Sequence, residues 1–236
     1  MKYLFLLFVF LAFPLNSLAQ APSAAGHAEE SARLDQVVRS YDKEFAGSVL
    51  VARGDKILLN KGYGEANREW TVPNGPDTRF RIASVTKQFT AAAVLLLAER
   101  GQLGLDDKIS SHIADSPAAW KDITIFHLLS HSSGIPDLTR FPNFREIQAM
   151  PTTAARSIAS FRDQPLEFIP GERFRYSSSG YILLGHLIEK TSRQTYDRFL
   201  QDAIFTPLGM KDTGYDRNAT VMTRRASGYT VTKTGV

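Results

Sequence analysis

The sequence has 236 residues, no cysteine and a formal net charge of +4. This length suits one domain around one core, and the lack of cysteine excludes disulfides and lipid attachment at a cysteine. Positive and negative charges are interspersed without a basic stripe, which argues against a nucleic-acid partner.

The first 19 residues are typical of a secretory signal peptide. A single positive charge, Lys2, precedes an apolar run over residues 3–15. Small residues at Ser17 and Ala19, or at Ala19 and Ala21, fit a cleavage site. We therefore expect a periplasmic or secreted protein with no stable membrane span after cleavage, a retained N-terminal anchor being the alternative.

The region after the signal peptide predicts a leader, a helix and a hairpin. Residues 20–30 are rich in small residues and predict a flexible leader, and a helix follows over 31–45. Two apolar runs, 47–53 and 56–62, predict strands joined by a turn at Gly54-Asp55. Residues 67–77 contain two prolines and a glycine and predict a loop.

The rest of the chain predicts mainly helices and loops. Helix-capping residues and apolar periodicity define the segments, whereas 138–151 shows no clear element. The expected helices are 88–100 ending at Gly101, 125–130 capped by Thr124, a helix from Thr152 or Thr153 to about 161, 181–191 and 196–205. A hairpin needs further strands to be stable, and few candidates follow residue 215.

A serine and a lysine stand at the start of the most apolar of these helices. Ser84 and Lys87 have the i, i+3 spacing that places two side chains on one helix face. There an amine can take the proton of a hydroxyl and make it a nucleophile. Ser40 and Lys43 share this spacing, but they lie in a polar stretch that predicts a solvated helix. Ser84 is therefore the candidate nucleophile.

Two other patterns predict no site. His127 and His131 have the i, i+4 spacing of a zinc helix, but Leu128 stands where a zinc peptidase has glutamate and no third ligand is evident. Gly62-Tyr63-Gly64 lacks the residues of a phosphate-binding loop. We expect neither a metal nor a cofactor.

Four segments in order resemble a known family. They are Phe80–Lys87, Gly101–Lys108, Ile123–Pro136, and Tyr176–Gly185 followed by Thr206–Met210. The chain from about Gly47 to Tyr229 resembles the serine β-lactamase and penicillin-binding-protein superfamily, in the branch of class C β-lactamases, D-Ala-D-Ala carboxypeptidases and related esterases. The resemblance implies an α/β (α+β) fold: an antiparallel sheet flanked by helices, with a helical lobe.

The resemblance also implies catalytic roles. Ser84 would be the acyl-accepting nucleophile, Lys87 its proton partner, and Tyr176 the base that activates Ser84 and later the deacylating water. The family usually has Tyr-x-Asn where this chain has Tyr176-Ser177-Ser178. Ser178 would then take the substrate-binding position, with a shorter reach toward a substrate amide than asparagine has.

The third motif of the family, lysine or histidine, a small residue and glycine, lies on an inner strand. Lys233-Thr234-Gly235 matches it in letters but follows Tyr176 closely, with only Val236 after it. We interpret this match as a decoy. Residues 31–236 would then form an incomplete domain without its C-terminal sheet strands, and without the inner-strand N–H of the oxyanion hole, a donor worth about a hundred- to a thousandfold in rate.

The sequence thus supports an exported serine hydrolase that forms an acyl-enzyme at Ser84. Its substrate would be a small molecule or peptidoglycan-like compound: a β-lactam, a D-Ala peptide or an ester. The alternative is a truncated, non-catalytic family member or a binding pseudoenzyme. The sequence carries no sign of the oligomeric state.

Overall fold

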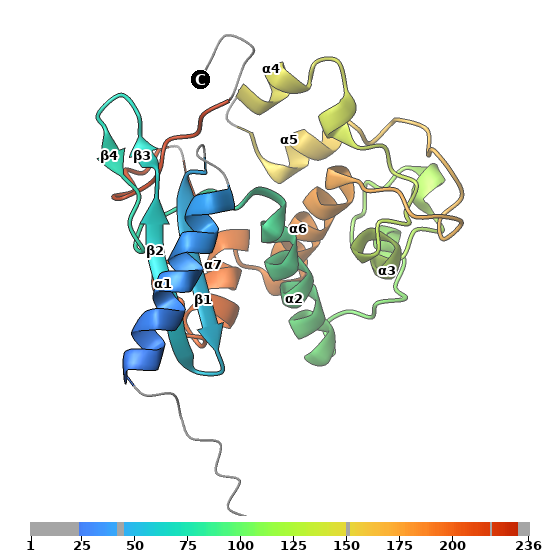
Figure 1. The fold of residues 1–236 in the computed structure, drawn as a ribbon. Helices are drawn as coiled ribbons and strands as arrows, with labels where there is room; N and C mark the ends of the chain where they lie inside the picture. Colours follow the sequence, from blue (N-terminus) through green and yellow to red (C-terminus); the bar gives the residue numbers. More distant parts are fainter. Residues whose placement is uncertain (1–23, 42–44, 150–151, 218, 231–236) are drawn as a thin grey trace, which may run out of the picture. The chain divides into compact units, whose positions relative to one another are not determined.

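The computed structural model describes residues 24–41, 45–149, 152–217 and 219–230, and these form two compact units (Figure 1). The first unit holds the described residues up to Arg79 and from Thr223 onward, and the second runs from Phe80 to Met222. The signal peptide expected at 1–19 and the Lys233-Thr234-Gly235 match lie outside the described residues.

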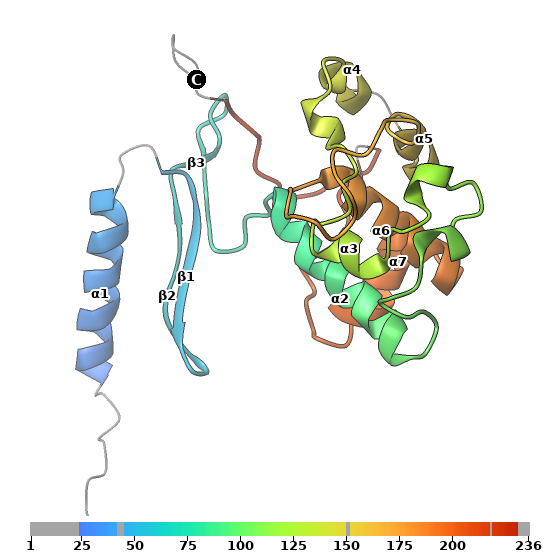
Figure 2. The ribbon, with the colours of Figure 1, turned by 90° about the vertical axis from the view of Figure 1, so that its right-hand side faces the viewer.

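The first unit contains one long helix beside a hairpin. Helix α1, Ala24–Tyr41, lies along strand β2, Lys56–Tyr63, which pairs antiparallel with β1, Gly47–Arg53 (Figure 2). The turn between the strands has Gly54 at a φ of +57°, a conformation that glycine adopts without strain. The expected hairpin is therefore confirmed.

The flexible leader expected at 20–30 is wrong from Ala24 onward, because α1 begins there. Ala28, Glu29 and Glu30 are strong helix formers, and Glu30 pairs with Arg53 of β1. Packing against the hairpin therefore extends the helix toward the N-terminus.

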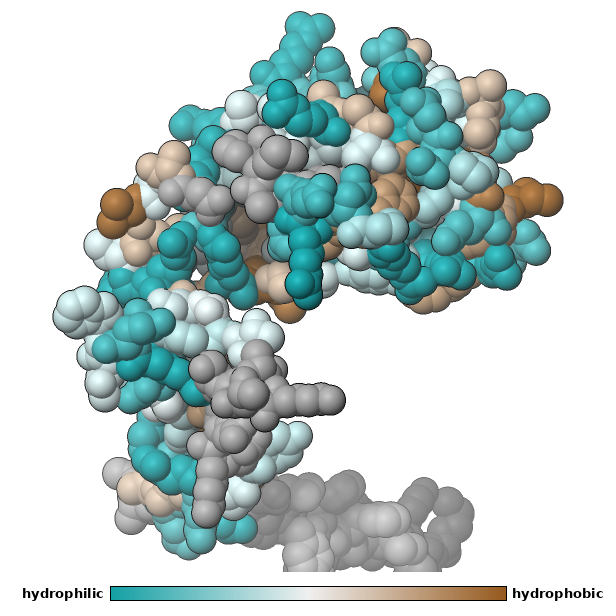
Figure 3. Space-filling model, turned by 90° about the horizontal axis from the view of Figure 1, so that it is seen from above, coloured by the Kyte–Doolittle hydropathy of each residue, from teal (hydrophilic) through white to brown (hydrophobic). Residues whose placement is uncertain are grey.

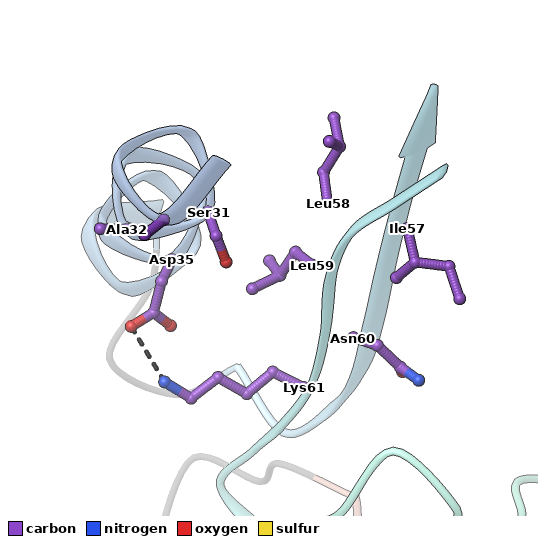
Figure 4. Close-up of a pocket in the computed structure, with 9 residues that line it drawn as sticks. Ser31, Ala32, Asp35, Ile57, Leu58, Leu59, Asn60 and Lys61 are labelled. Atoms are coloured by element: carbon purple, nitrogen blue, oxygen red, sulfur yellow. Dashed lines mark hydrogen bonds and ion pairs between the residues drawn. The ribbon is translucent and has the colours of Figure 1, made fainter. Parts of the chain in front are cut away.

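A carboxylate joins α1 to the hairpin across an open hollow (Figure 4). Asp35 accepts hydrogen bonds from Lys61 Nζ at 3.0 Å and from the Tyr63 hydroxyl at 2.8 Å. These bonds, that from Lys61 first, lower the pKa of Asp35 to about 2. The helix is thus fixed by polar contacts as well as by the buried Leu58 and Leu59.

The loop expected at 67–77 overlaps a small second sheet. Strand β3, Glu65–Asn67, pairs antiparallel with β4, Val72–Pro73. Residues 224–227 run beside this region, where Arg79 donates its N–H to the carbonyl of Arg224 at 2.8 Å. Strands this short carry too little pattern to be separated from a loop in the sequence.

The second unit is helical. Its helices are α2 Thr86–Glu99, α3 Ile125–Leu129, α4 Phe144–Ala149, α5 Ala154–Ala159, α6 Ser178–Ser192 and α7 Tyr196–Leu200. The helices expected after Gln88, Thr124, Thr153 and Tyr181 are confirmed, each with ends shifted by a few residues. The helix expected at 196–205 changes at Gln201 into a π-helical turn, η5, Gln201–Phe205. Helix α4 lies in the segment without a clear sequence pattern.

Helices α2 and α6 pack together at the centre of this unit. The buried face of α2 is Thr90, Ala93, Val94 and Leu97, which is the i, i+3, i+4, i+7 pattern of an amphipathic helix. From α6, Leu183, Leu184 and Leu187 are buried in the same core cluster. Each buried leucine contributes about 1.5–3 kcal/mol relative to an exposed one. This packing fixes the position of α2 and of the turn at its N-terminus.

The described residues include no helix long and apolar enough to cross a membrane. The face drawn in Figure 3 is mostly hydrophilic, with scattered apolar side chains.

Candidate active site

The candidate nucleophile lies on a tight turn that leads into α2. Residues Ala83–Val85 form a 3-10 turn, η1, and α2 continues it from Thr86. Ala83 has a φ of +44°, a conformation that residues with a Cβ rarely adopt. The Ser84 side chain is consequently exposed at the N-terminal end of α2, where the helix dipole favours negative charge on an attacking oxygen.

Two side chains reach the Ser84 hydroxyl. Its Oγ lies 2.7 Å from the phenolic oxygen of Tyr176 and 3.3 Å from Lys87 Nζ. Lys87 comes from the first turn of α2, and Tyr176 precedes α6 by two residues. The structure therefore brings together the three residues that the sequence proposed as catalytic, from segments about ninety residues apart.

Lys87 also lies against two aromatic rings. Its Nζ is 4.8 Å from the ring centre of Tyr176 and 5.4 Å from that of Tyr181, distances at which a cation is attracted to an aromatic face. The ammonium group is thereby held between the serine and the tyrosines.

The phenol of Tyr176 is tuned by its neighbours. Burial alone would raise its pKa, but hydrogen bonds from Lys87 and Ser84 and the positive charge of Lys87 outweigh burial and lower the pKa below 10.0. A phenol with a lowered pKa gives up its proton more readily near neutral pH. The cluster can therefore pass the serine proton to the tyrosine oxygen.

Ser178 begins α6 beside this cluster. Its hydroxyl also helps to lower the pKa of Tyr176. Its backbone N–H donates to Asp137 Oδ1 at 3.2 Å, while the Ser177 hydroxyl caps the helix by accepting the N–H of Gly180. Ser178 is thus fixed by its backbone and keeps its short side chain beside Tyr176.

The rival serine has a different role. Ser40 Oγ donates to the backbone carbonyl of Val37, within α1, at 2.9 Å. Lys43 lies outside the described residues. Within α1 a serine bonded in this way simply returns a hydrogen bond to its own helix.

The two histidines of the i, i+4 pair accept hydrogen bonds from backbone N–H groups. His127 Nδ1 accepts the N–H of Thr124, whose side chain in turn accepts the N–H of His127, so the two residues form a capping box for α3. His131 Nδ1 accepts the N–H of Ser177 at 3.2 Å. No group of three or more metal-ligating side chains is found in the part of the chain that the structure describes.

The sequence did not identify His131 as part of the site. Its ring lies against Tyr176, with the ring centres 4.6 Å apart. The signal was present, since His131 stands three residues before Gly134 in one of the segments that carry the family resemblance. The i, i+4 spacing of His127 and His131, however, suggested only a zinc helix, which the sequence then excluded.

The fold and this cluster define a β-lactamase-like protein, and comparison with known proteins agrees. The family model described as Beta-lactamase matches residues 34–236, so the chain belongs to the Beta-lactamase family. In "Protein flp" of Staphylococcus aureus (strain MRSA252), 187 residues align at 34% identity, covering 77% of this chain and 37% of that protein.

Two solved structures show the same fold. The penicillin-binding protein from Bacillus halodurans has a TM-score of 0.77 and 32% identity, with 86% of this chain and 62% of that chain covered. The D-amino acid amidase from Ochrobactrum anthropi SV3, complexed with L-phenylalanine, has a TM-score of 0.71 and 31% identity, with 85% and 54% covered. The chain therefore spans little more than a third of the curated relative and half to two thirds of these structures.

Proposed function

We propose that this chain is an exported serine hydrolase that forms an acyl-enzyme at Ser84. The observation that carries the proposal is the contact of Ser84 Oγ with both the Tyr176 phenol and Lys87 Nζ. A hydroxyl held between a base and a cation is the arrangement that nucleophilic catalysis by serine needs.

The reaction would run in two halves. Tyr176, as phenolate, takes the proton from Ser84 while Oγ bonds to the substrate carbonyl carbon. The tetrahedral intermediate then collapses, its carbon–leaving-group bond breaks, and the leaving group takes the proton from Tyr176. In the second half, water gives a proton to Tyr176 while its oxygen bonds to the acyl carbon of the Ser84 ester. The bond between that carbon and Oγ then breaks, Oγ takes the proton back from Tyr176, and the acid product leaves.

Lys87 supports both halves through its charge. The ammonium group lies beside the serine oxygen and over the Tyr176 ring, so it stabilises negative charge on either oxygen. The family model and the relatives, among them a penicillin-binding protein and an amidase, support the same chemistry.

The proposed substrates are a β-lactam, a D-Ala peptide or an ester of a small molecule or peptidoglycan-like compound. Ser178 supports esters among these. Its hydroxyl lies beside Tyr176, and it lacks the longer side chain with donor and acceptor that an asparagine would offer to a substrate amide.

Export is proposed from the sequence of residues 1–19. If the signal peptide is cleaved, the protein recovered outside the cytoplasm will begin at Gln20 or Pro22, which N-terminal sequencing reads directly. A product that still begins at Met1 contradicts cleavage.

Covalent labelling tests the acyl-enzyme. A fluorophosphonate and a fluorescent penicillin should each add one label, and peptide mapping should place it on Ser84. The Ser84→Ala variant should lose the label, and the matched Ser40→Ala variant should keep it. If neither reagent labels the folded wild-type chain, the hydrolase proposal fails and the non-catalytic alternative takes its place.

A further inference from the structure

His131 holds the backbone on both sides of Tyr176. The N–H of Arg175 donates to the His131 carbonyl at 2.8 Å, and the N–H of Ser177 donates to His131 Nδ1 at 3.2 Å. One residue thus fixes the backbone N–H groups of the residues before and after the proposed base. A side-chain substitution at His131 removes the Nδ1 acceptor and leaves the backbone carbonyl in place.

The imidazole ring also packs against the phenol ring. The ring centre of His131 lies 4.6 Å from that of Tyr176 and 4.9 Å from that of Tyr181, and the two tyrosine rings are tilted to it by 33° and 32°. Tyr181 is itself fixed, because its hydroxyl donates to the Leu129 carbonyl at 3.0 Å. The His131 ring packs against both tyrosines, and the fixed Tyr181 ring restricts where the imidazole can lie against Tyr176.

The backbone of His131 is held in an unusual conformation. Its φ is +58°, the left-handed region that costs a residue with a Cβ about 1 kcal/mol or more. This conformation follows the end of α3, where the N–H of His131 donates to the Leu128 carbonyl at 3.3 Å and that of Ser132 to the His127 carbonyl at 2.9 Å. The turn directs the His131 side chain to Ser177.

From this geometry we infer that His131 is a positioning residue, which holds the Tyr176 oxygen at Ser84 by accepting the Ser177 N–H and by packing on the phenol ring. The inference rests on the proposed function, since it concerns the same base. It gives His131 no contact with substrate.

The contact requires a neutral imidazole with its proton on Nε2, because Nδ1 accepts a hydrogen bond. The ionisable groups around it are Lys87 on α2, Asp137, Tyr176 and Tyr181. Asp137 directly precedes η4, a 3-10 turn over Leu138–Arg140. Burial first, and then the charge of Lys87, lower the pKa of His131, while Asp137 opposes them. The imidazole is therefore neutral near pH 7.

Two substitutions separate the two contacts. His131→Phe keeps a ring against Tyr176 but removes the acceptor. His131→Asn keeps an acceptor near Nδ1 and tolerates a positive φ, but removes the ring. The matched control is His127→Phe, because His127 Nδ1 also accepts a backbone N–H, that of Thr124, away from the tyrosine.

The first measurement is the rate of Ser84 labelling by a fluorophosphonate as a function of pH. We expect His131→Phe to lower the maximal labelling rate roughly 10- to 100-fold with little change in reagent affinity, since small misplacements of a catalytic group have effects of this size. Its pH profile should move to higher pH. His131→Asn should recover part of the rate, and His127→Phe should match the wild type. Near-UV circular dichroism confirms that each variant is folded.

A second measurement needs no activity. With tyrosine labelled at 13Cζ, the Tyr176 resonance, assigned by its loss in Tyr176→Phe, reports the phenol pKa directly. We expect that pKa to rise toward 10.0 in folded His131→Phe and to stay unchanged in His127→Phe. An unchanged Tyr176 titration in folded His131→Phe overturns the positioning role, whether or not the wild type is labelled. Absence of labelling in the wild type counts against the hydrolase proposal alone.

Discussion

The Ser84 hydroxyl is closer to Tyr176 than to Lys87: its Oγ lies 2.7 Å from the phenolic oxygen and 3.3 Å from Nζ. In the proposed mechanism, the shorter contact favours Tyr176 over Lys87 as the direct proton acceptor. Lys87 contacts both Ser84 and the Tyr176 ring, and its charge lowers the pKa of the phenol.

Removing the phenolic oxygen should therefore disable the serine. Tyr176→Phe keeps the ring on His131 but leaves no base, and general base catalysis is worth about a hundred- to ten-thousandfold. We expect fluorophosphonate labelling of Ser84 to slow by at least the lower figure. The control is Tyr196→Phe, which removes a hydroxyl bonded to Thr90 at 2.6 Å outside the cluster. Equal loss in both variants would point to a general disturbance of α2.

The pH dependence of labelling should follow Tyr176. Because its pKa is lowered from 10.0, the phenolate fraction, and with it the labelling rate, should rise with pH through that lowered pKa. Tyr176→Phe should flatten this limb of the profile. A limb that survives in Tyr176→Phe assigns the base to another group.

Lys87→Met tests whether the positive charge of Lys87 controls the pKa of the Tyr176 phenol. Methionine keeps much of the length and volume of the side chain and removes the ammonium group, so the Tyr176 phenol loses the neighbour that stabilises its ionised form. We expect the alkaline limb of the labelling profile to move to higher pH and the maximal rate to fall. If the limb stays in place, the charge of Lys87 does not control the phenol.

Substrate preference should respond to Ser178. In Ser178→Asn a longer side chain with a donor and an acceptor replaces the hydroxyl beside Tyr176. One added hydrogen bond of about 1–1.5 kcal/mol corresponds to roughly a tenfold change. We expect labelling by a fluorescent penicillin to rise by about that factor relative to the fluorophosphonate. Ser192→Asn, at the far end of α6, is the control, and an equal ratio in both variants removes Ser178 from substrate recognition.

The sequence predicted the parts of the fold that carry strong local patterns. The hairpin around Gly54, the apolar helix after Ser84 and the Thr124 cap were all placed correctly. Residues 24–30 of α1 were missed, because their alanines and Gly26 continue the small-residue composition of residues 20–23, which is typical of an unstructured leader. Their helical conformation depends on contact with β1 and β2, which a local pattern does not contain.

The candidate site divides in the same way. Ser84 and Lys87 follow from spacing on one helix, which is local, whereas Tyr176 came only from resemblance to a family. The distance between Tyr176 and Ser84 is set by the packing of α2 against α6. His131 was missed because its role depends on a left-handed backbone and on the amide of Ser177, and neither is visible in residue spacing.

Gly134, three residues after His131, occupies a position that glycine fits and a residue with a Cβ does not. Gly134 has a φ of +77°, and a Cβ added there would lie 2.3 Å from the carbonyl oxygen of Phe168. Gly101, at the end of α2, has a similar φ of +67° but no atom within 4 Å of an added Cβ. Alanine substitutions at the two positions therefore distinguish the cost of backbone strain alone from the cost of strain with a steric clash.

Gly101→Ala should lower the free energy of unfolding by only about 1 kcal/mol, the cost of a left-handed alanine. Gly134→Ala adds a clash with backbone that side-chain rotation cannot relieve, so we expect a loss of about 3 kcal/mol or more. Urea unfolding followed by circular dichroism measures both values. Because Gly134 also accepts the N–H of Glu167 at 2.8 Å, the clash should displace the segment that leads to Tyr176 and slow Ser84 labelling as well. Equal losses of stability in the two variants would mean that the loop around Phe168 yields to the added methyl group.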